Sequence, residues 1–120
     1  MYALSVLQPW ASRIVSGARL FEVRPWHTEY RGPLAIHASR RLPPEGFLPG
    51  RWLPLGAILG TVELTDCVRV EDLPAEERAL ADFRPSHWVW RFRNPFPFPF
   101  PFPFPARGRL GLFRIALDLS

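Results

Sequence analysis

Short stretches in which apolar and polar positions alternate with a period of two recur along the chain, a pattern typical of β-strands. The longest of them, residues 56–70, is rich in aliphatic and β-branched side chains, which indicates a strand buried on both faces and broken near Asp66. The predicted strands cover residues 2–7, 19–24, 33–38, 56–70, 88–93 and 110–117.

Two further segments carry helical patterns. Residues 9–16 open with a proline at the first helical position, repeat apolar residues four positions apart and precede Gly17, a suitable C-cap. Residues 71–83, rich in Ala, Glu and Leu, predict a second helix. Because strands dominate and do not alternate regularly with helices, we expect a mainly β (α+β) fold, a small and mostly antiparallel β-barrel with short flanking helices.

Residues 95–105 repeat Phe and Pro without interruption. In an extended strand, a period of two places the Phe side chains on one face and the Pro side chains on the other. The N–H groups that proline lacks would then fall on one edge, so the strand could pair on its other edge only and would resist strand addition. Two alternatives stay open: a stiff linker or loop lying over the barrel, and a ligand for a proline-binding domain.

Composition narrows the class of protein. A chain of 120 residues that is 48% hydrophobic suits a single domain over residues 1–120 and argues against global disorder. No apolar run reaches the ~18 residues that span a membrane, and the N-terminus lacks a basic leader. Cys67 is the one cysteine, so no internal disulfide can form; we expect a cytoplasmic protein with a packed core thiol.

The charge distribution indicates a polyanionic partner. The net charge is +4 and every basic residue is arginine, although the composition bias of a GC-rich genome also explains the absence of lysine. Arginines dominate residues 1–41 and 84–120, whereas acidic residues dominate residues 61–83. If the two basic segments share a face, they form a positive surface of the kind that binds nucleic acid.

Residues 17–39 bring arginines, aromatic residues and turn glycines closest together. We expect the arginines to hold phosphates, since a guanidinium binds phosphate with a planar fork, and Trp26 or Tyr30 to stack an unpaired base. Alternation places Glu22 and Arg24 on one face, where they could bind a ligand or could simply form an ion pair with each other. In the same way, Trp26 and Tyr30 could simply pack the loop instead of stacking a base. The candidate binding residues are Arg19, Glu22, Arg24, Trp26, Tyr30, Arg31 and Ser39.

Three side chains are candidates for acid–base catalysis, namely Glu22, His37 and Glu63. His37 lies in an apolar strand, where it could act as a general base or be a structural histidine with satisfied hydrogen bonds. Glu63 could take part only if its strand borders the site. The three histidines and the cysteine show no metal-ligand spacing, so we expect neither a metal nor another cofactor.

Five segments in this order resemble the ASCH domain family of the PUA-like superfamily: LSVLQPWASRIVSG, GARLFEVRPW, YRGPLAIHAS, GAILGTVELTDCV and RGRLGLFRI. Gly17, Glu22 and Arg24 fill their places in the family signature G-x-K-x-x-E-x-R, and Arg19 stands where lysine is usual. The resemblance implies a PUA-like β-barrel over nearly the whole chain, with a cleft beside this motif that binds RNA or another nucleic acid.

The resemblance also implies an alternative function. Some small bacterial members are amidohydrolases that deacylate acetylated cytidine with the motif lysine and a nearby threonine, and ribonuclease activity has been attributed to others. Here Arg19 replaces the lysine and Glu22 lies near the threonine's place. Arginine stays protonated at any usable pH, whereas a buried lysine can lose its proton. We therefore expect a module that binds nucleic acid, with RNA preferred to DNA, and that has no membrane partner. The alternative is a hydrolase that acts on acetylated cytidine nucleosides or on RNA.

Overall fold

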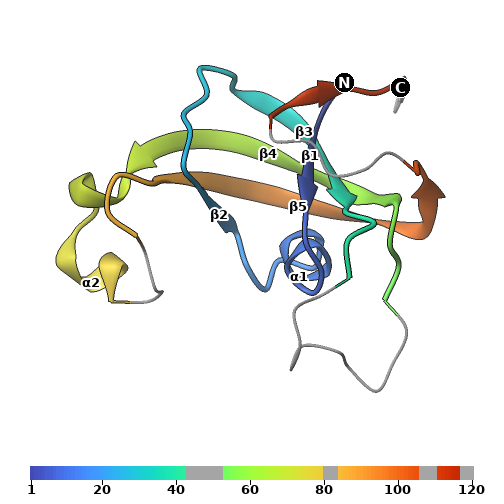
Figure 1. Cartoon of the computed structure of the whole chain (residues 1–120), viewed down its shortest axis with the longest axis horizontal. Coiled ribbons are helices and arrows are strands. Elements are labelled where there is room, and N and C mark those ends of the chain that lie inside the picture. Colours follow the sequence, from blue (N-terminus) through green and yellow to red (C-terminus); the bar gives the residue numbers. More distant parts are fainter. Residues whose placement is uncertain (43–52, 80–83, 106–110, 117–120) are drawn as a thin grey trace.

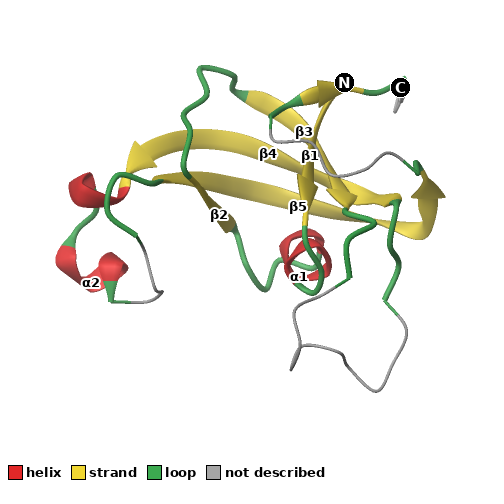
Figure 2. Ribbon diagram, viewed as in Figure 1, coloured by secondary structure: helices red, strands yellow, loops and turns green. Residues whose placement is uncertain are grey.

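Six strands form one sheet in the order β2-β5-β4-β3-β1-β6 in the computed structural model of the chain, which describes residues 1–42, 53–79, 84–105 and 111–116 (Figure 1). Two short helices and a 3-10 turn complete the fold (Figure 2). The elements are β1 Tyr2–Val6, α1 Trp10–Val15, β2 Phe21–Arg24, β3 Gly32–Ala38, β4 Ala57–Arg69, the 3-10 turn Val70–Asp72, α2 Ala75–Arg78, β5 Trp88–Pro103 and β6 Phe113–Arg114.

The sheet is mostly antiparallel, and only β1 and β3 pair in parallel. Strands β4 and β5 form a long curved ribbon that carries the shorter strands (Figure 1). The predicted mainly β architecture with short helices is confirmed. Among the described residues, however, β2 and β6 are end strands of an open sheet, so the predicted barrel is not closed by backbone hydrogen bonds.

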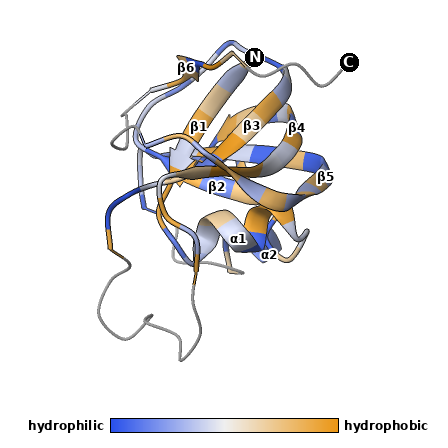
Figure 3. Ribbon diagram, turned by 90° about the vertical axis from the view of Figure 1, so that its right-hand side faces the viewer, coloured by the Kyte–Doolittle hydropathy of each residue, from blue (hydrophilic) through white to orange (hydrophobic). Residues whose placement is uncertain are grey.

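The two faces of the sheet bury different residues, as the period of two requires. On β1 and β3, Leu4 and Ile36 belong to the larger core, which α1 covers, and Ala3 and Ala35 belong to a smaller core on the other side. We call these the α1 face and the outer face. Figure 3 shows the hydrophobic stripes that result along the strands.

Two elements are shorter than the sequence predicts. The second helix is interrupted because Leu73, in extended backbone, precedes Pro74, and a residue before proline is disfavoured in helical conformation. The 3-10 turn and α2 remain in place of one helix over residues 71–83, of which residues 80–83 lie outside the described part. The closing strand, predicted over residues 110–117, is β6 alone within residues 111–116.

The Phe-Pro repeat continues β5 as an extended strand as far as Pro103. It pairs with β4, although the register shifts where β5 carries extra residues, and Asn94 beside one shift has a φ of 52°. The side chains of Phe98 and Phe104 pack on the outer core, whereas Phe96, Phe100 and Phe102 are exposed. The extended-strand interpretation therefore describes this segment better than a linker.

Candidate functional site

Arg19, Glu22 and Arg24 meet in one network, which we call the Arg–Glu cluster. Glu22 and Arg24 lie two residues apart on β2, so their side chains share the α1 face, and Arg19 reaches them from the preceding turn. Glu22 Oε1 accepts hydrogen bonds from Arg19 Nη2 at 3.2 Å and from the Val23 N–H at 3.0 Å. Glu22 Oε2 accepts one from Arg24 Nη2 at 3.2 Å. The carboxylate thus holds both guanidinium groups in place.

Arg24 also joins two strands that are far apart in the sheet order. Its Nη2 donates to the backbone carbonyl of Ser5 at 2.6 Å, which links β2 to β1 across three intervening strands. A side chain therefore closes the opening that backbone pairing leaves. No residue pattern could point to Ser5, because its contact with Arg24 is made by a backbone carbonyl.

Arg19 lies between aromatic rings and charges. Its guanidinium carbon is 4.6 Å from the ring centroid of Phe21 and 5.8 Å from that of Trp10, within cation–π range. Burial lowers the pKa of the Arg19 guanidinium, Glu22 opposes this, and Arg13 and Arg24 lower it further. The cluster therefore holds two cations against one carboxylate, and the charge of Arg13 also acts on Arg19. Neither Arg13 nor Trp10 is among the binding residues predicted from the sequence, because α1 reaches Arg19 only in the folded chain.

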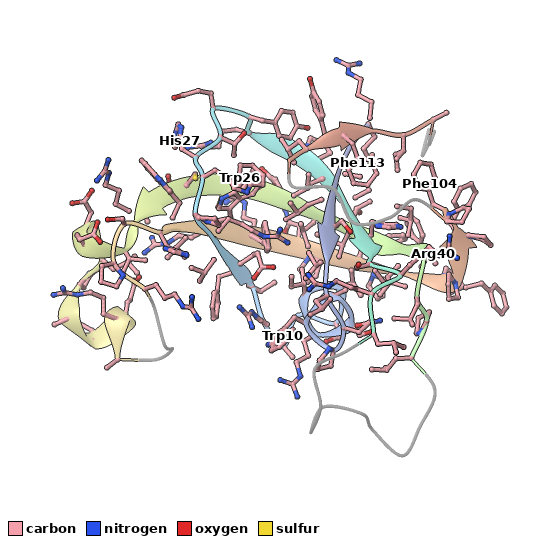
Figure 4. All side chains as sticks on the ribbon, viewed as in Figure 1. Trp10, Trp26, His27, Arg40, Phe104 and Phe113 are labelled. Carbon is pink, nitrogen blue, oxygen red and sulfur yellow. The ribbon has the colours of Figure 1, made fainter. Side chains whose placement is uncertain are left out.

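The aromatic candidates are packed within the protein. Trp26 meets Trp90 edge to face with ring centroids 4.7 Å apart, and Trp90 Nε1 donates to the Trp26 carbonyl at 3.3 Å. Tyr30 meets Tyr2 at the same separation and donates its hydroxyl to the Pro33 carbonyl. Burial, followed by Tyr2, raises the pKa of Tyr30. Both side chains are half-buried, and these contacts fit packing of the loop between β2 and β3. Figure 4 shows Trp26 over the sheet.

Arg31 and Ser39 find their partners outside the cluster. Arg31 is exposed, and its Nη1 donates to the carbonyls of Thr28 and Tyr30 at 2.9 and 2.8 Å. Its Nη2 lies 3.9 Å from the Asp66 carboxylate. Ser39 is buried at the end of β3, where its hydroxyl accepts a hydrogen bond from the Arg41 N–H at 3.1 Å. Neither is drawn into the network around Glu22.

The three catalytic candidates lie in three different places. Glu22 belongs to the cluster, and Glu63 pairs at the surface with Arg93 at 3.4 Å and Asn94 at 2.8 Å. His37 is fully buried on the outer face, between Ser5 and the end of the Phe-Pro segment. Its Nε2 must donate to the Phe104 carbonyl, 2.7 Å away, so its Nδ1 accepts from the Ser5 hydroxyl at 3.0 Å. These contacts fit the structural interpretation of His37.

The buried position of His37 predicts how stability depends on pH. Burial lowers the pKa of His37, and the hydrogen bond to Phe104 offsets only part of this. The unfolded chain therefore binds the proton more readily, and the stabilisation present above a pH of about 6.5 is lost as the pH falls. Urea unfolding should show a lower free energy of unfolding at pH ~5.5 than at pH ~7.5. The His37→Gln variant should lose part of that difference; an identical pH profile would contradict the prediction.

Metal binding finds no support in the described segments, where no three or more His, Cys, Asp and Glu side chains are grouped to hold an ion. Cys67 is buried in the core of the α1 face, and burial raises the pKa of its thiol. No helix in the described ranges is long and apolar enough to cross a membrane. The chemistry that the site offers is thus that of fixed guanidinium groups beside aromatic rings.

Known proteins resemble this chain in sequence and in fold. The model of the ASCH domain family matches residues 4–95. Activating signal cointegrator 1 of Homo sapiens is 32% identical over 110 residues, which cover 78% of this chain and 19% of that protein. The protein of the same name from Mus musculus is 31% identical with the same coverage. The chain thus spans about a fifth of the length of the curated relatives it matches.

Solved structures agree on the fold. The crystal structure of ASCH from Zymomonas mobilis gives a TM-score of 0.64 at 15% identity, with 95% of this chain and 86% of that chain covered. A mutant of that protein gives the same score and identity and covers 87% of its own chain. Such low identity establishes the fold alone, whereas the family model covers most of the sequence. The chain belongs to the ASCH domain family.

Proposed function

We propose that this domain binds nucleic acid through the Arg–Glu cluster, with single-stranded or looped RNA as the preferred ligand. The observation that carries the proposal is the fixing of two guanidinium groups by one carboxylate, with Arg13 beside them. Two arginines held in place lose little conformational freedom when they bind a phosphate. Membership of the ASCH family, a PUA-like family linked to RNA, supports the same class of ligand.

The hydrogen bonds of the cluster favour binding over catalysis. Both oxygens of Glu22 accept hydrogen bonds, so the carboxylate orients its neighbours and is poorly placed to remove a proton from a substrate. In the described part of the chain, Arg19 uses Nε and Nη2 and Arg24 uses Nη2 for hydrogen bonds. The remaining N–H groups of the two guanidiniums are the donors that we expect to bind phosphate oxygens. Such charge-assisted hydrogen bonds are stronger than those between neutral groups.

The test is a titration of a 5′-labelled single-stranded RNA of about 12 nucleotides, followed by fluorescence anisotropy. The affinity of the unchanged protein should fall steeply between about 50 mM and about 200 mM salt, because phosphate contacts release counterions. Arg19→Gln should weaken binding about tenfold and reduce the slope of log affinity against log salt by about one. Urea unfolding of the same variant measures any loss of stability, since Arg19 also contacts Glu22 and the Phe21 carbonyl.

The matched control is Arg78→Gln, which removes one exposed arginine from α2. It lowers the net charge by the same amount as Arg19→Gln, so a general charge effect would weaken both variants equally. An affinity independent of salt, or equal losses in the two variants, would overturn the proposed function.

A further inference from the structure

The free edge of β5 carries exposed phenyl rings. On the side facing β2, β5 pairs through Trp88 to Arg91, and the Phe92 N–H donates one more hydrogen bond to the Leu20 carbonyl. No described strand continues that pairing along the Phe-Pro segment. Here the exposed fractions are 58% for Phe96, 82% for Phe100 and 45% for Phe102. We call these three residues the phenyl row. Three of the five large apolar side chains that are exposed among the described residues lie on this one segment, so it is the candidate apolar interaction surface.

The Phe-Pro segment passes the turn that leads to Arg19. Pro95, the residue before Phe96, lies against Gly17: a Cβ atom added to Gly17 would be 3.4 Å from Pro95 Cγ. Gly17 in turn ends the turn after α1 and lies two residues before Arg19. A ligand that continued from the cluster to the phenyl row would cross the edge of β5 near Pro95.

The same segment disfavours a peptide as the ligand. Peptides attach to sheet edges by adding a strand, which needs a backbone N–H at every second residue of the edge. Proline at every second position of residues 95–105 removes those donors and leaves only acceptors along one edge. What the segment still offers is the faces of its phenyl rings, on which bases of any sequence can stack.

Charge favours a nucleic acid as the ligand. Arg93, 67% exposed, flanks one end of the segment, and Arg40, which donates to the Pro105 carbonyl at 3.1 Å, flanks the other. The ring of Phe96 meets that of Phe98 edge to face, with centroids 6.1 Å apart, so Phe98 supports it from the outer core. Exposed rings between two arginines can stack unpaired bases while the arginines attract the phosphates.

We propose that single-stranded RNA bound at the Arg–Glu cluster continues over Pro95 and stacks its next bases on the phenyl row. The inference rests on the proposed function and extends it, since it makes the ligand a strand of several nucleotides rather than a nucleotide or a duplex. The cluster holds one end of the strand by its phosphates, and the phenyl row holds the following bases by their faces.

The experiment compares oligouridine RNAs of about 4 and about 12 nucleotides, the range of site sizes for single-strand binders. The variant Phe96→Ala with Phe100→Ala should bind the longer RNA at least about thirtyfold more weakly, because two stacking contacts are lost, and should bind the shorter RNA as the unchanged protein does. Leu42→Ala is the matched control, since it also removes an exposed apolar side chain, 74% exposed, and should leave both affinities unchanged.

The outcomes separate the two proposals. If the phenyl variant and the unchanged protein bind the longer RNA with equal affinity, the inference is overturned. If Arg19→Gln lowers the affinity for both RNAs in the same series, the proposed function stands although the inference fails. Circular dichroism of each variant should show unchanged melting, because the replaced rings are exposed; a loss of affinity with intact melting is the supporting result.

Discussion

Gly60→Ala is expected to lower the free energy of unfolding by about 3 kcal/mol, near the top of the range for overpacked cores. Gly60 lies in the middle of β4, where β5 crosses it closely. A Cβ atom here would be 2.9 Å from the Cα atom of Pro97 and closer still to the carbonyl oxygen of Phe96. Both are backbone atoms, so the collision cannot be relieved by turning a side chain, and β4 and β5 would have to separate.

Gly111→Ala is the matched control, since a Cβ atom added at Gly111 meets nothing within 4 Å. Its free energy of unfolding should stay within ~0.5 kcal/mol of the unchanged protein, the usual range for surface substitutions. Urea titrations followed by tryptophan fluorescence measure both variants. Equal stabilities would show that β5 does not approach β4 as closely at Gly60 as the structure has it.

Arg24→Met is expected to have the second large effect, on stability and on RNA binding together. The substitution leaves Glu22 with one guanidinium partner and the Ser5 carbonyl without its donor. Breaking a buried ion pair costs about 3–5 kcal/mol, and because both side chains keep some exposure we expect about 2 kcal/mol here. RNA affinity should fall about a hundredfold, the upper end for a charge-assisted contact, since the lost phosphate donor also fixes the opening.

Two further variants distinguish the causes. Arg93→Met removes an exposed arginine that pairs with Glu63, and it should cost at most ~0.5 kcal/mol of stability. Arg24→Met combined with Glu22→Gln removes the unpaired carboxylate and should regain part of the lost stability, but its RNA affinity should stay low. An RNA affinity that recovers with stability would mean that Arg24 only supports the fold.

Local patterns predicted most of the fold because the period of two and the turn residues act over short distances. The Phe-Pro repeat is the clearest case, since alternation alone indicated an extended strand with its Phe side chains on one face. The interrupted second helix was also readable from Pro74 and its extended neighbour Leu73, but its favourable composition outweighed that signal in our prediction. Composition indicates only how readily a segment forms a helix, whereas a proline restricts the backbone angles of the residue before it.

Contacts within the candidate site were predictable where residue spacing determines geometry, and they were not where the fold brings distant segments together. Glu22 and Arg24 share a face because they are two residues apart, and the structure joins them with Arg19. The contact of Arg24 with Ser5 depends on the curvature of the whole sheet, which no local pattern reports. His37 alternates like its neighbours, yet the face it occupies became clear only once Phe104 was placed against it.

The contact between Arg24 and Ser5 makes the molecule mechanically uneven. Elsewhere in the described sheet, neighbouring strands are joined by ladders of backbone hydrogen bonds, which open only cooperatively. Between β2 and β1, among the described residues, the hydrogen bond is made by one guanidinium group, so its loss would leave every ladder of backbone hydrogen bonds intact. We therefore expect the sheet to open along this line before any strand pair separates.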